Sequence, residues 1–149
     1  MATMNSALSK KNEYWLSKER TKELEWHCRQ YNQWAEAARN INSFSNLVIP
    51  EGYVDVSDLS DPTVRAAKER EWYLDQMHYI NCAVQDAVHE YYYGFSTYLK
   101  KAVVNGWSYD ILKANYPDLK LNRRDYYAMR RKFFCILDLY VRGFVHEME

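Results

Sequence analysis

The chain has 149 residues, 48% of them hydrophobic, and its 20 Lys and Arg side chains balance 20 Asp and Glu side chains. This length predicts one domain, or one domain with a helical extension, and the apolar share excludes a disordered chain. Only four glycines and three prolines are present. Because helix breakers and period-two alternation are both scarce, we expect an all-α fold.

The composition also indicates the cellular compartment in which we expect the chain. No stretch approaches the roughly 18 continuous apolar residues of a membrane span, and the N-terminal residues lack the pattern of a secretory signal. The three cysteines, Cys28, Cys82 and Cys135, are odd in number and widely separated. We therefore expect free thiols, a cytoplasmic location and no contact with a membrane.

The first two thirds of the chain predict a flexible tail over 1–11 and a long antiparallel helical hairpin over 12–93, with a loop at about 42–60. A helix over 12–41 is too long to stand alone and needs a partner along its length. Asp61-Pro62 begins the second helix, where the missing N–H of proline does no harm. Apolar side chains then repeat at three- and four-residue steps, as in a coiled coil, at Leu74, Met77, Val84, Val88 and Tyr91. The wide aromatic seams favour a homodimer formed through these N-terminal helices.

Residues 94–149 predict a helix-turn-helix unit. A helix over 95–104 ends at the Asn105-Gly106 turn, and Ser108 caps a short second helix that Pro117 ends. Asn122 caps a longer, basic third helix. A core-facing stripe on that helix is formed by Tyr126, Met129, Phe133, Ile136, Leu137 and Tyr140. Trp107, Ile111 and Leu112 suit the small core shared with the second helix.

The charges are unevenly distributed. Residues 100–132 carry nine basic and three acidic side chains, a net charge of +6, whereas residues 1–99 carry −4. A basic region on a mildly acidic body is expected where one end of a protein meets phosphate, and the third helix could enter the major groove of double-stranded DNA. The alternative is an ordinary solvated helix face. The predicted groove contacts are Asn122, Arg123, Arg124, Tyr127 and Arg131, and the predicted phosphate contacts are Lys100, Lys101, Lys113, Lys120, Arg130 and Lys132.

Two segments carry a resemblance. The stretch 107–112, Trp-Ser-Tyr-Asp-Ile-Leu, followed by 122–132, Asn-Arg-Arg-Asp-Tyr-Tyr-Ala-Met-Arg-Arg-Lys, resembles phage-encoded transcriptional regulators of the RinA and ArpU type. The C-terminal part of these regulators is similar to the last DNA-binding region of sigma factors. The stretch between the two helices, around 114–118, is longer than the turn of that family. The resemblance implies a regulator of late phage or mobile-element genes in a host bacterial cell, with RNA polymerase as a further partner of the hairpin.

No motif indicates an enzyme, a metal site or a cofactor. His78 and Cys82 lie four residues apart on one predicted helix, but a zinc site needs three or four ligands. Carboxylates are interleaved with Lys and Arg, as on a solvated helix face. A second hypothesis therefore comes from another non-enzymatic class: a phage-like protein-interaction module that inhibits or adapts a host protein through its aromatic hairpin.

Overall fold

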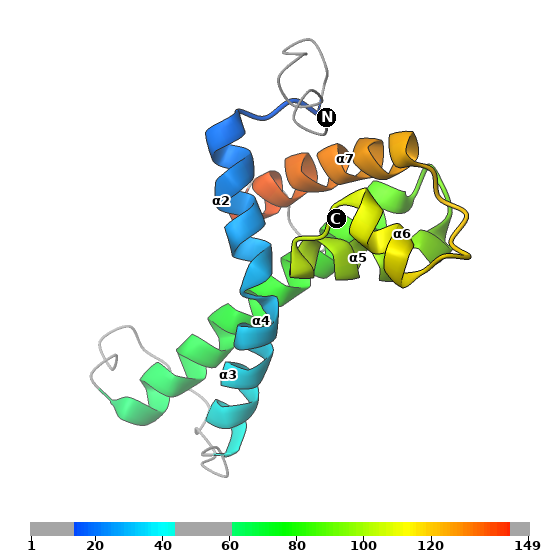
Figure 1. The fold of residues 1–149 in the computed structure, drawn as a ribbon. Coiled ribbons are helices and arrows are strands. Elements are labelled where there is room, and N and C mark those ends of the chain that lie inside the picture. The colour runs from blue at the N-terminus through cyan, green and yellow to red at the C-terminus, as the bar shows by residue number, and fades with distance from the viewer. Residues whose placement is uncertain (1–13, 44–60, 144–149) are drawn as a thin grey trace. The chain divides into compact units, whose positions relative to one another are not determined.

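The computed structural model describes residues 14–43 and 61–143, and within these ranges it contains helices and no strand. The helices are α2 (Lys18–Arg29), α3 (Tyr31–Ser43), α4 (Pro62–Val88), the 3₁₀ helix η2 (Tyr93–Phe95), α5 (Ser96–Asn105), α6 (Tyr109–Asn115) and α7 (Arg123–Val141) (Figure 1). The expected all-α fold is confirmed. None of the described helices is long and apolar enough to span a membrane.

The chain divides into two compact units, Met1–Gln30 with Tyr79–Glu149, and Tyr31–His78. Helix α4 contributes residues to both. This division differs from the expected one, in which a hairpin over 12–93 precedes a separate unit that begins at residue 94. Helix α2 instead belongs with the C-terminal helices, and the predicted tail and loop lie largely outside the described residues.

The single long helix expected over 12–41 is two helices. Residues 15–17 are not helical, and α2 begins after Ser17, whose Oγ accepts a hydrogen bond from the backbone N–H of Arg20 at 3.1 Å. Helix α2 ends at Gln30, whose N–H bonds to the carbonyl oxygen of His27 at 3.2 Å. No glycine or proline marks this break, so the periodicity alone could not show it.

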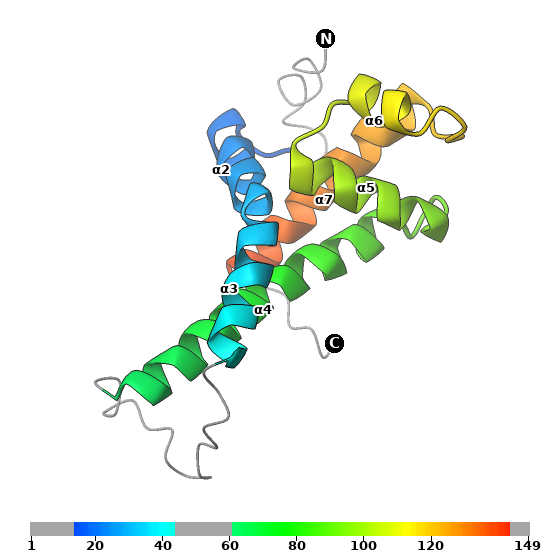
Figure 2. The ribbon, with the colours of Figure 1, turned by 60° about the horizontal axis from the view of Figure 1, so that its bottom comes forward.

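The first unit has a continuous apolar core. Helices α2, α5 and α7 pack against one another, and α6 packs against α5 and α7 (Figures 1 and 2). The fully buried side chains include Leu24 and Cys28 from α2, Leu99 from α5, Leu112 from α6 and, from α7, Tyr126, Met129, Phe133 and Leu137. The core stripe predicted on α7 is confirmed at these last four positions and at Tyr140, whereas Ile136 is half-buried.

The second unit consists of α3 and the first part of α4. Trp34 is buried, and its ring meets the ring of Trp72 edge to face at a centroid distance of 5.8 Å. Helix α4 begins at Pro62 as expected, and the carboxylate of Asp61 caps it by accepting from the N–H of Thr63 at 2.8 Å. Sequence patterning therefore located the start of this helix correctly.

The helix boundaries between residues 88 and 123 mostly follow the sequence signals. Gly106 ends α5 with φ +69°, a left-handed conformation that favours glycine. A Cβ there would also require the guanidinium of Arg29 to shift. Ser108 caps α6 and Asn122 caps α7, both as expected. Helix α4 ends at Val88, earlier than the expected end at residue 93.

Candidate nucleic-acid interface

The connection between α6 and α7, residues 116–122, is longer than the three or four residues of a usual helix-turn-helix. It is nevertheless held at several points. The N–H of Tyr116 bonds to the carbonyl oxygen of Leu112, and the N–H of Leu119 bonds to that of Tyr116, both at 3.0 Å. Leu119 and Leu121 are buried. The connection is thus part of the packed unit despite its length.

Lys113 and Lys120 have different surroundings in this connection. The Nζ of Lys113 donates to the carbonyl oxygen of Leu119 at 2.6 Å, so this cation holds the connection together. Lys120 is exposed between two buried leucines, which direct it away from the core. Both lysines were predicted to contact phosphate, and Lys120 is therefore better placed to do so than Lys113.

Three tyrosines join α6, the connection and α7. The hydroxyl of Tyr126 donates to the carbonyl oxygen of Trp107 at 2.9 Å, and the hydroxyl of Tyr109 donates to that of Leu121 at 2.6 Å. The hydroxyl of Tyr127 accepts from the backbone N–H of Tyr109 at 3.2 Å. Tyr127 is only 7% exposed. The expectation that it faces outward is wrong, because both Tyr126 and Tyr127 lie on the buried side of α7.

The first turn of α7 lies at the surface. Asn122, Arg123 and Arg124 are exposed, and the side-chain oxygen of Asn122 accepts from the N–H of Asp125 at 2.8 Å. This hydrogen bond fixes Asn122 as a cap rather than leaving its oxygen available to a base. The side chain of Arg124 forms no ion pair or hydrogen bond with any other described residue. It is the least constrained of the arginines predicted to contact bases.

Arg123 is held by two residues of α6. One nitrogen of its guanidinium forms an ion pair with the carboxylate of Asp110, and the group lies over the ring of Tyr109, 5.1 Å from the centroid. Both partners of the ion pair remain accessible, since the side chains of Arg123 and Asp110 are 55% and 71% exposed. No local sequence pattern indicates Asp110 as the partner of Arg123, because the two lie thirteen positions apart with a chain reversal between them.

The middle of α7 is occupied by ion pairs within the first unit. Arg130 binds Glu25 of α2 at 2.6 Å and lies over the ring of Phe134, 5.1 Å from the centroid. Lys132 binds Glu90 at 3.0 Å. The side chains of Arg130 and Lys132 are only 22% and 12% exposed. Their expected availability to phosphate is therefore contradicted: these cations connect parts of the unit to one another.

The remaining predicted contacts differ in their exposure. Arg131 is half-buried and forms no ion pair with another described residue, and Lys100 is half-buried. Lys101 is exposed, with its Nζ 5.6 Å from the centroid of the Tyr116 ring. A hydrogen bond with Tyr116 raises the pKa of Lys101, so it remains a cation.

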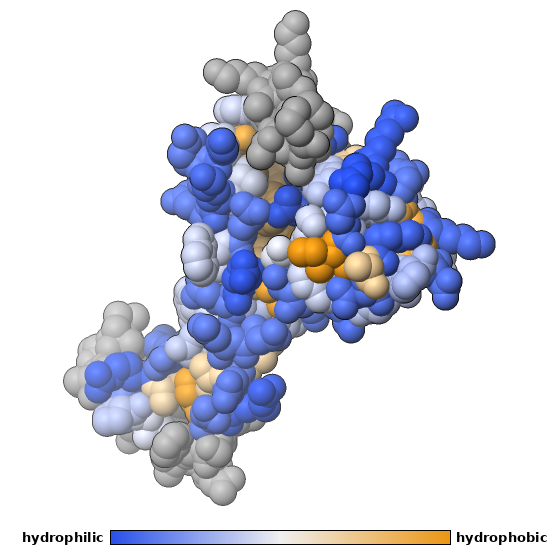
Figure 3. Space-filling model, viewed as in Figure 1, coloured by the Kyte–Doolittle hydropathy of each residue, from blue (hydrophilic) through white to orange (hydrophobic). Residues whose placement is uncertain are grey.

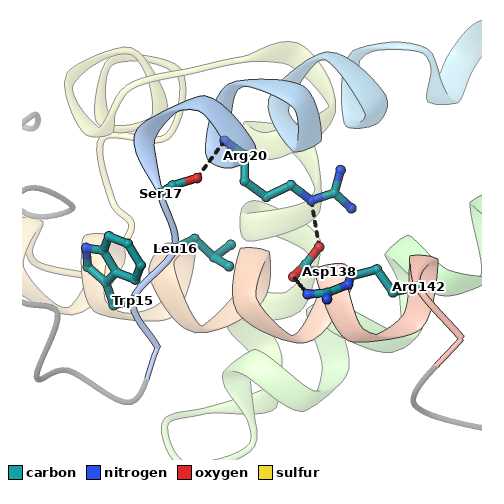
Figure 4. Close-up of a pocket in the computed structure, with 6 residues that line it drawn as sticks. All are labelled: Trp15, Leu16, Ser17, Arg20, Asp138 and Arg142. Carbon is teal, nitrogen blue, oxygen red and sulfur yellow. Dashed lines mark hydrogen bonds and ion pairs between the residues drawn. The ribbon is translucent and has the colours of Figure 1, made fainter.

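Near its C-terminal end, α7 carries a buried carboxylate. Asp138 accepts from the Nε of Arg20 at 2.6 Å and from Arg142 at 3.2 Å, so two guanidinium groups share one acid (Figure 4). Trp15, Leu16 and Ser17 complete the lining of a hollow of about 460 Å³ at this point. The carboxylate of Asp138 partly neutralises the charges of both guanidinium groups, and the hollow lies where α2 meets α7.

Several apolar side chains lie on the surface. Trp26 is 68% exposed and Tyr92 is 65% exposed. Ile111, which we expected in the core shared by α6 and α7, is 46% exposed. The visible face of the first unit is otherwise largely hydrophilic, with a small hydrophobic patch (Figure 3). The exposed aromatics supply contact area that protein partners commonly use.

The described residues contain no group of three or more His, Cys, Asp or Glu side chains suited to a metal ion. Comparisons of the chain with protein-family models, with curated proteins and with solved structures found no match. Function is therefore inferred from the side chains themselves, and chiefly from the exposure of the first turn of α7 compared with the packing of the rest of that helix.

Proposed function

We propose that this chain is a sequence-specific, double-stranded DNA-binding regulator without enzymatic activity, whose α7 enters the major groove with its first turn. The observation that supports the proposal is the exposure of Asn122, Arg123 and Arg124 at the start of a helix whose remaining length is packed against α2, α5 and α6. A reading helix needs both properties, because the packed part fixes the direction of the exposed part.

Burial and contacts within the first unit reduce the number of residues that we propose to contact DNA. Arg123, Arg124 and Arg131 are the candidates for base edges, where arginine most often binds guanine. Lys120 and Lys101 are the candidates for phosphate, which positions the protein without reading sequence. Tyr127, Arg130, Lys132 and Lys113 instead hold the unit together. The resemblance to RinA- and ArpU-type regulators suggests phage or mobile-element genes as the targets.

The test begins with selection of bound duplexes from a random DNA library, followed by fluorescence anisotropy on the selected and on random duplexes. Replacing Arg124 by Ala should weaken binding to the selected duplex by about 5- to 150-fold, the equivalent of about 1–3 kcal/mol. Binding to random duplex should weaken less. Arg39→Ala is the matched control, because Arg39 is an exposed arginine of α3. Equal losses on both duplexes, or equal losses from both variants, would contradict base reading by Arg124.

The second unit is proposed to form a homodimer, and it is the candidate surface for RNA polymerase. Trp72 and Leu74 of α4 are 49% and 38% exposed. Trp34 of α3, whose ring meets the ring of Trp72, is buried. A two-helix unit has little surface to bury by itself, and a second copy would cover more of it. Sedimentation of the full chain and of a Trp72→Ala variant tests this: the variant should shift the equilibrium toward monomer.

A protein-interaction module remains the second candidate, favoured by the exposure of Trp26 and Tyr92. The two functions differ in one simple measurement. Binding to random duplex at about 50 mM salt that collapses at about 200 mM supports the DNA-binding function, because phosphate contacts release counterions. A chain that binds no duplex at about 50 mM salt supports the interaction module instead.

A further inference from the structure

We infer that Asp110 is a positioning residue for base recognition: it holds the guanidinium of Arg123 in one orientation, so that Arg123 reads a guanine while Asp110 itself touches no DNA. This inference rests on the proposed DNA-binding function and adds a residue from α6 to it. It concerns selectivity between sequences rather than the overall strength of binding.

The geometry around Arg123 is the basis for the inference. The carboxylate of Asp110 binds one nitrogen of the guanidinium, while the ring of Tyr109 lies beneath the group. Tyr109 is itself fixed, because its hydroxyl donates to the carbonyl oxygen of Leu121 at 2.6 Å. A carboxylate at one edge and a ring at one face together restrict both the position and the tilt of the guanidinium plane.

The arrangement leaves the rest of Arg123 available. Its side chain is 55% exposed, and a guanidinium carries five N–H donors, whereas the contact with Asp110 engages only one of its nitrogens. Arg123 also occupies the first position of α7, directly after its cap Asn122. An exposed arginine whose plane is already fixed loses less conformational entropy on forming the two parallel hydrogen bonds that guanine accepts.

The contrast with other acid–arginine pairs of the unit supports a role beyond stability. Glu25 and Arg130 form a partly buried pair between α2 and α7, with side chains 39% and 22% exposed. The Asp110–Arg123 pair joins two exposed side chains and therefore contributes little to folding. It lies at the exposed end of α7, where DNA would bind in the proposed function.

The experiment measures the affinity of the full chain for the selected duplex and for the same duplex with a single G·C pair changed to A·T, tested in turn at each G·C pair. Asp110→Asn keeps the size of the side chain and removes its charge. Asp118→Asn is the matched control, because Asp118 is an exposed acid in the connection that follows α6 and has no partner among the described residues. Arg123→Lys keeps the cation but lacks the planar fork.

Removing either acid should raise affinity for every duplex, because one negative charge near phosphate is lost. We expect Asp118→Asn to leave the ratio between the two duplexes unchanged. Asp110→Asn should lower that ratio by about 5- to 20-fold at one base pair, and Arg123→Lys should lower it at the same base pair, since both change the presentation of one guanidinium. A purely structural role for Asp110 would not move the ratio at a single base pair.

Two results would overturn the inference, and they are distinguishable. If the wild-type chain prefers the selected duplex but Asp110→Asn keeps the full ratio, base reading does not depend on Asp110 and only this inference fails. If the wild-type chain binds no duplex at about 50 mM salt, the proposed DNA-binding function fails and this inference fails with it. Circular dichroism of each variant confirms that the helices remain formed.

Discussion

The first turn of α7 and the middle of the same helix are built differently. Around residues 122–124 the side chains are exposed, and Arg124 forms no ion pair within the described part of the chain. Farther along the helix, Arg130 binds Glu25, Lys132 binds Glu90 and Asp138 binds Arg20, all within the first unit. A local run of basic residues thus combines two roles: some cations stabilise the unit, and others remain available to a partner.

This difference shows why the net charge of a segment overestimates the surface that is available for binding. The nine cations of residues 100–132 predicted a basic region where the protein meets phosphate. Two of them, Arg130 and Lys132, are largely removed from solvent by their ion pairs, and Lys113 is bonded to a backbone carbonyl oxygen. The exposed cations that remain for phosphate or bases are Lys101, Lys120, Arg123 and Arg124, so this surface is smaller than the predicted basic region. The following predictions test this division of α7 into a packed part and an exposed part.

The largest effect is expected from the packed part. Phe133 has no exposed surface and contacts Phe134 at a ring-centroid distance of 5.0 Å. Replacing Phe133 by Ala should lower the free energy of unfolding by about 3–5 kcal/mol, since it removes a buried ring and leaves a cavity. Urea denaturation followed by circular dichroism measures the change. Arg124→Ala in the exposed part should change it by less than about 0.5 kcal/mol. A loss above about 2 kcal/mol for Arg124→Ala would show that the first turn is not a separate, weakly packed region.

The next effect depends on pH and concerns Tyr126. Burial raises the pKa of Tyr126 to about 12, although the nearby Arg130 lowers it somewhat. An unfolded tyrosine ionises near pH 10. Below that pH the phenol is neutral in both states, and between about pH 10 and 12 the unfolded state alone loses the proton, so stability falls as pH rises. The loss should reach about 2–3 kcal/mol.

Tyr126→Phe tests this sign. The variant should lose about 1 kcal/mol at pH 7, because the hydrogen bond to Trp107 disappears. It should then show a shallower decline in stability above pH 10 than the wild-type chain. Burial also raises the pKa of the Cys28 thiol, so part of the alkaline decline should persist. Tyr92→Phe, at an exposed tyrosine, is the control; an identical decline in Tyr126→Phe and wild type would contradict the burial argument.

The sequence predicted the parts of the fold that local chemistry controls. Capping side chains located the starts of α6 and α7 at Ser108 and Asn122, and Gly106 located the end of α5. Proline located the start of α4. These signals act within a few residues, so they can be read without knowledge of the tertiary structure.

The parts that the sequence did not predict depend on distant contacts. The break at Gln30 has no glycine or proline and separates Leu24 and Cys28, buried in one unit, from Trp34, buried in the other. Tyr127 was assigned outward because the helix was divided into one buried and one exposed side, whereas Tyr127 is buried and its hydroxyl accepts from the N–H of Tyr109 in α6. The pairing of Arg130 with Glu25 joins residues 105 positions apart, and no local pattern could identify it.

The smallest effect is expected when double-mutant cycles compare the coupling energies of the two ion pairs. The cycle of Arg130→Met and Glu25→Gln should give a coupling energy of about 1–2 kcal/mol, because their contact at 2.6 Å is partly shielded from water. The cycle of Arg123→Met and Asp110→Asn should give less than about 0.5 kcal/mol, since solvent screens two exposed side chains. Urea denaturation of the wild type and the six variants supplies both values, and about 1 M salt should reduce the second further. Equal coupling in the two cycles would mean that the Arg123 pair stabilises the fold as strongly as the buried pair. The ion pair at the exposed end of α7 would then be explained by folding alone.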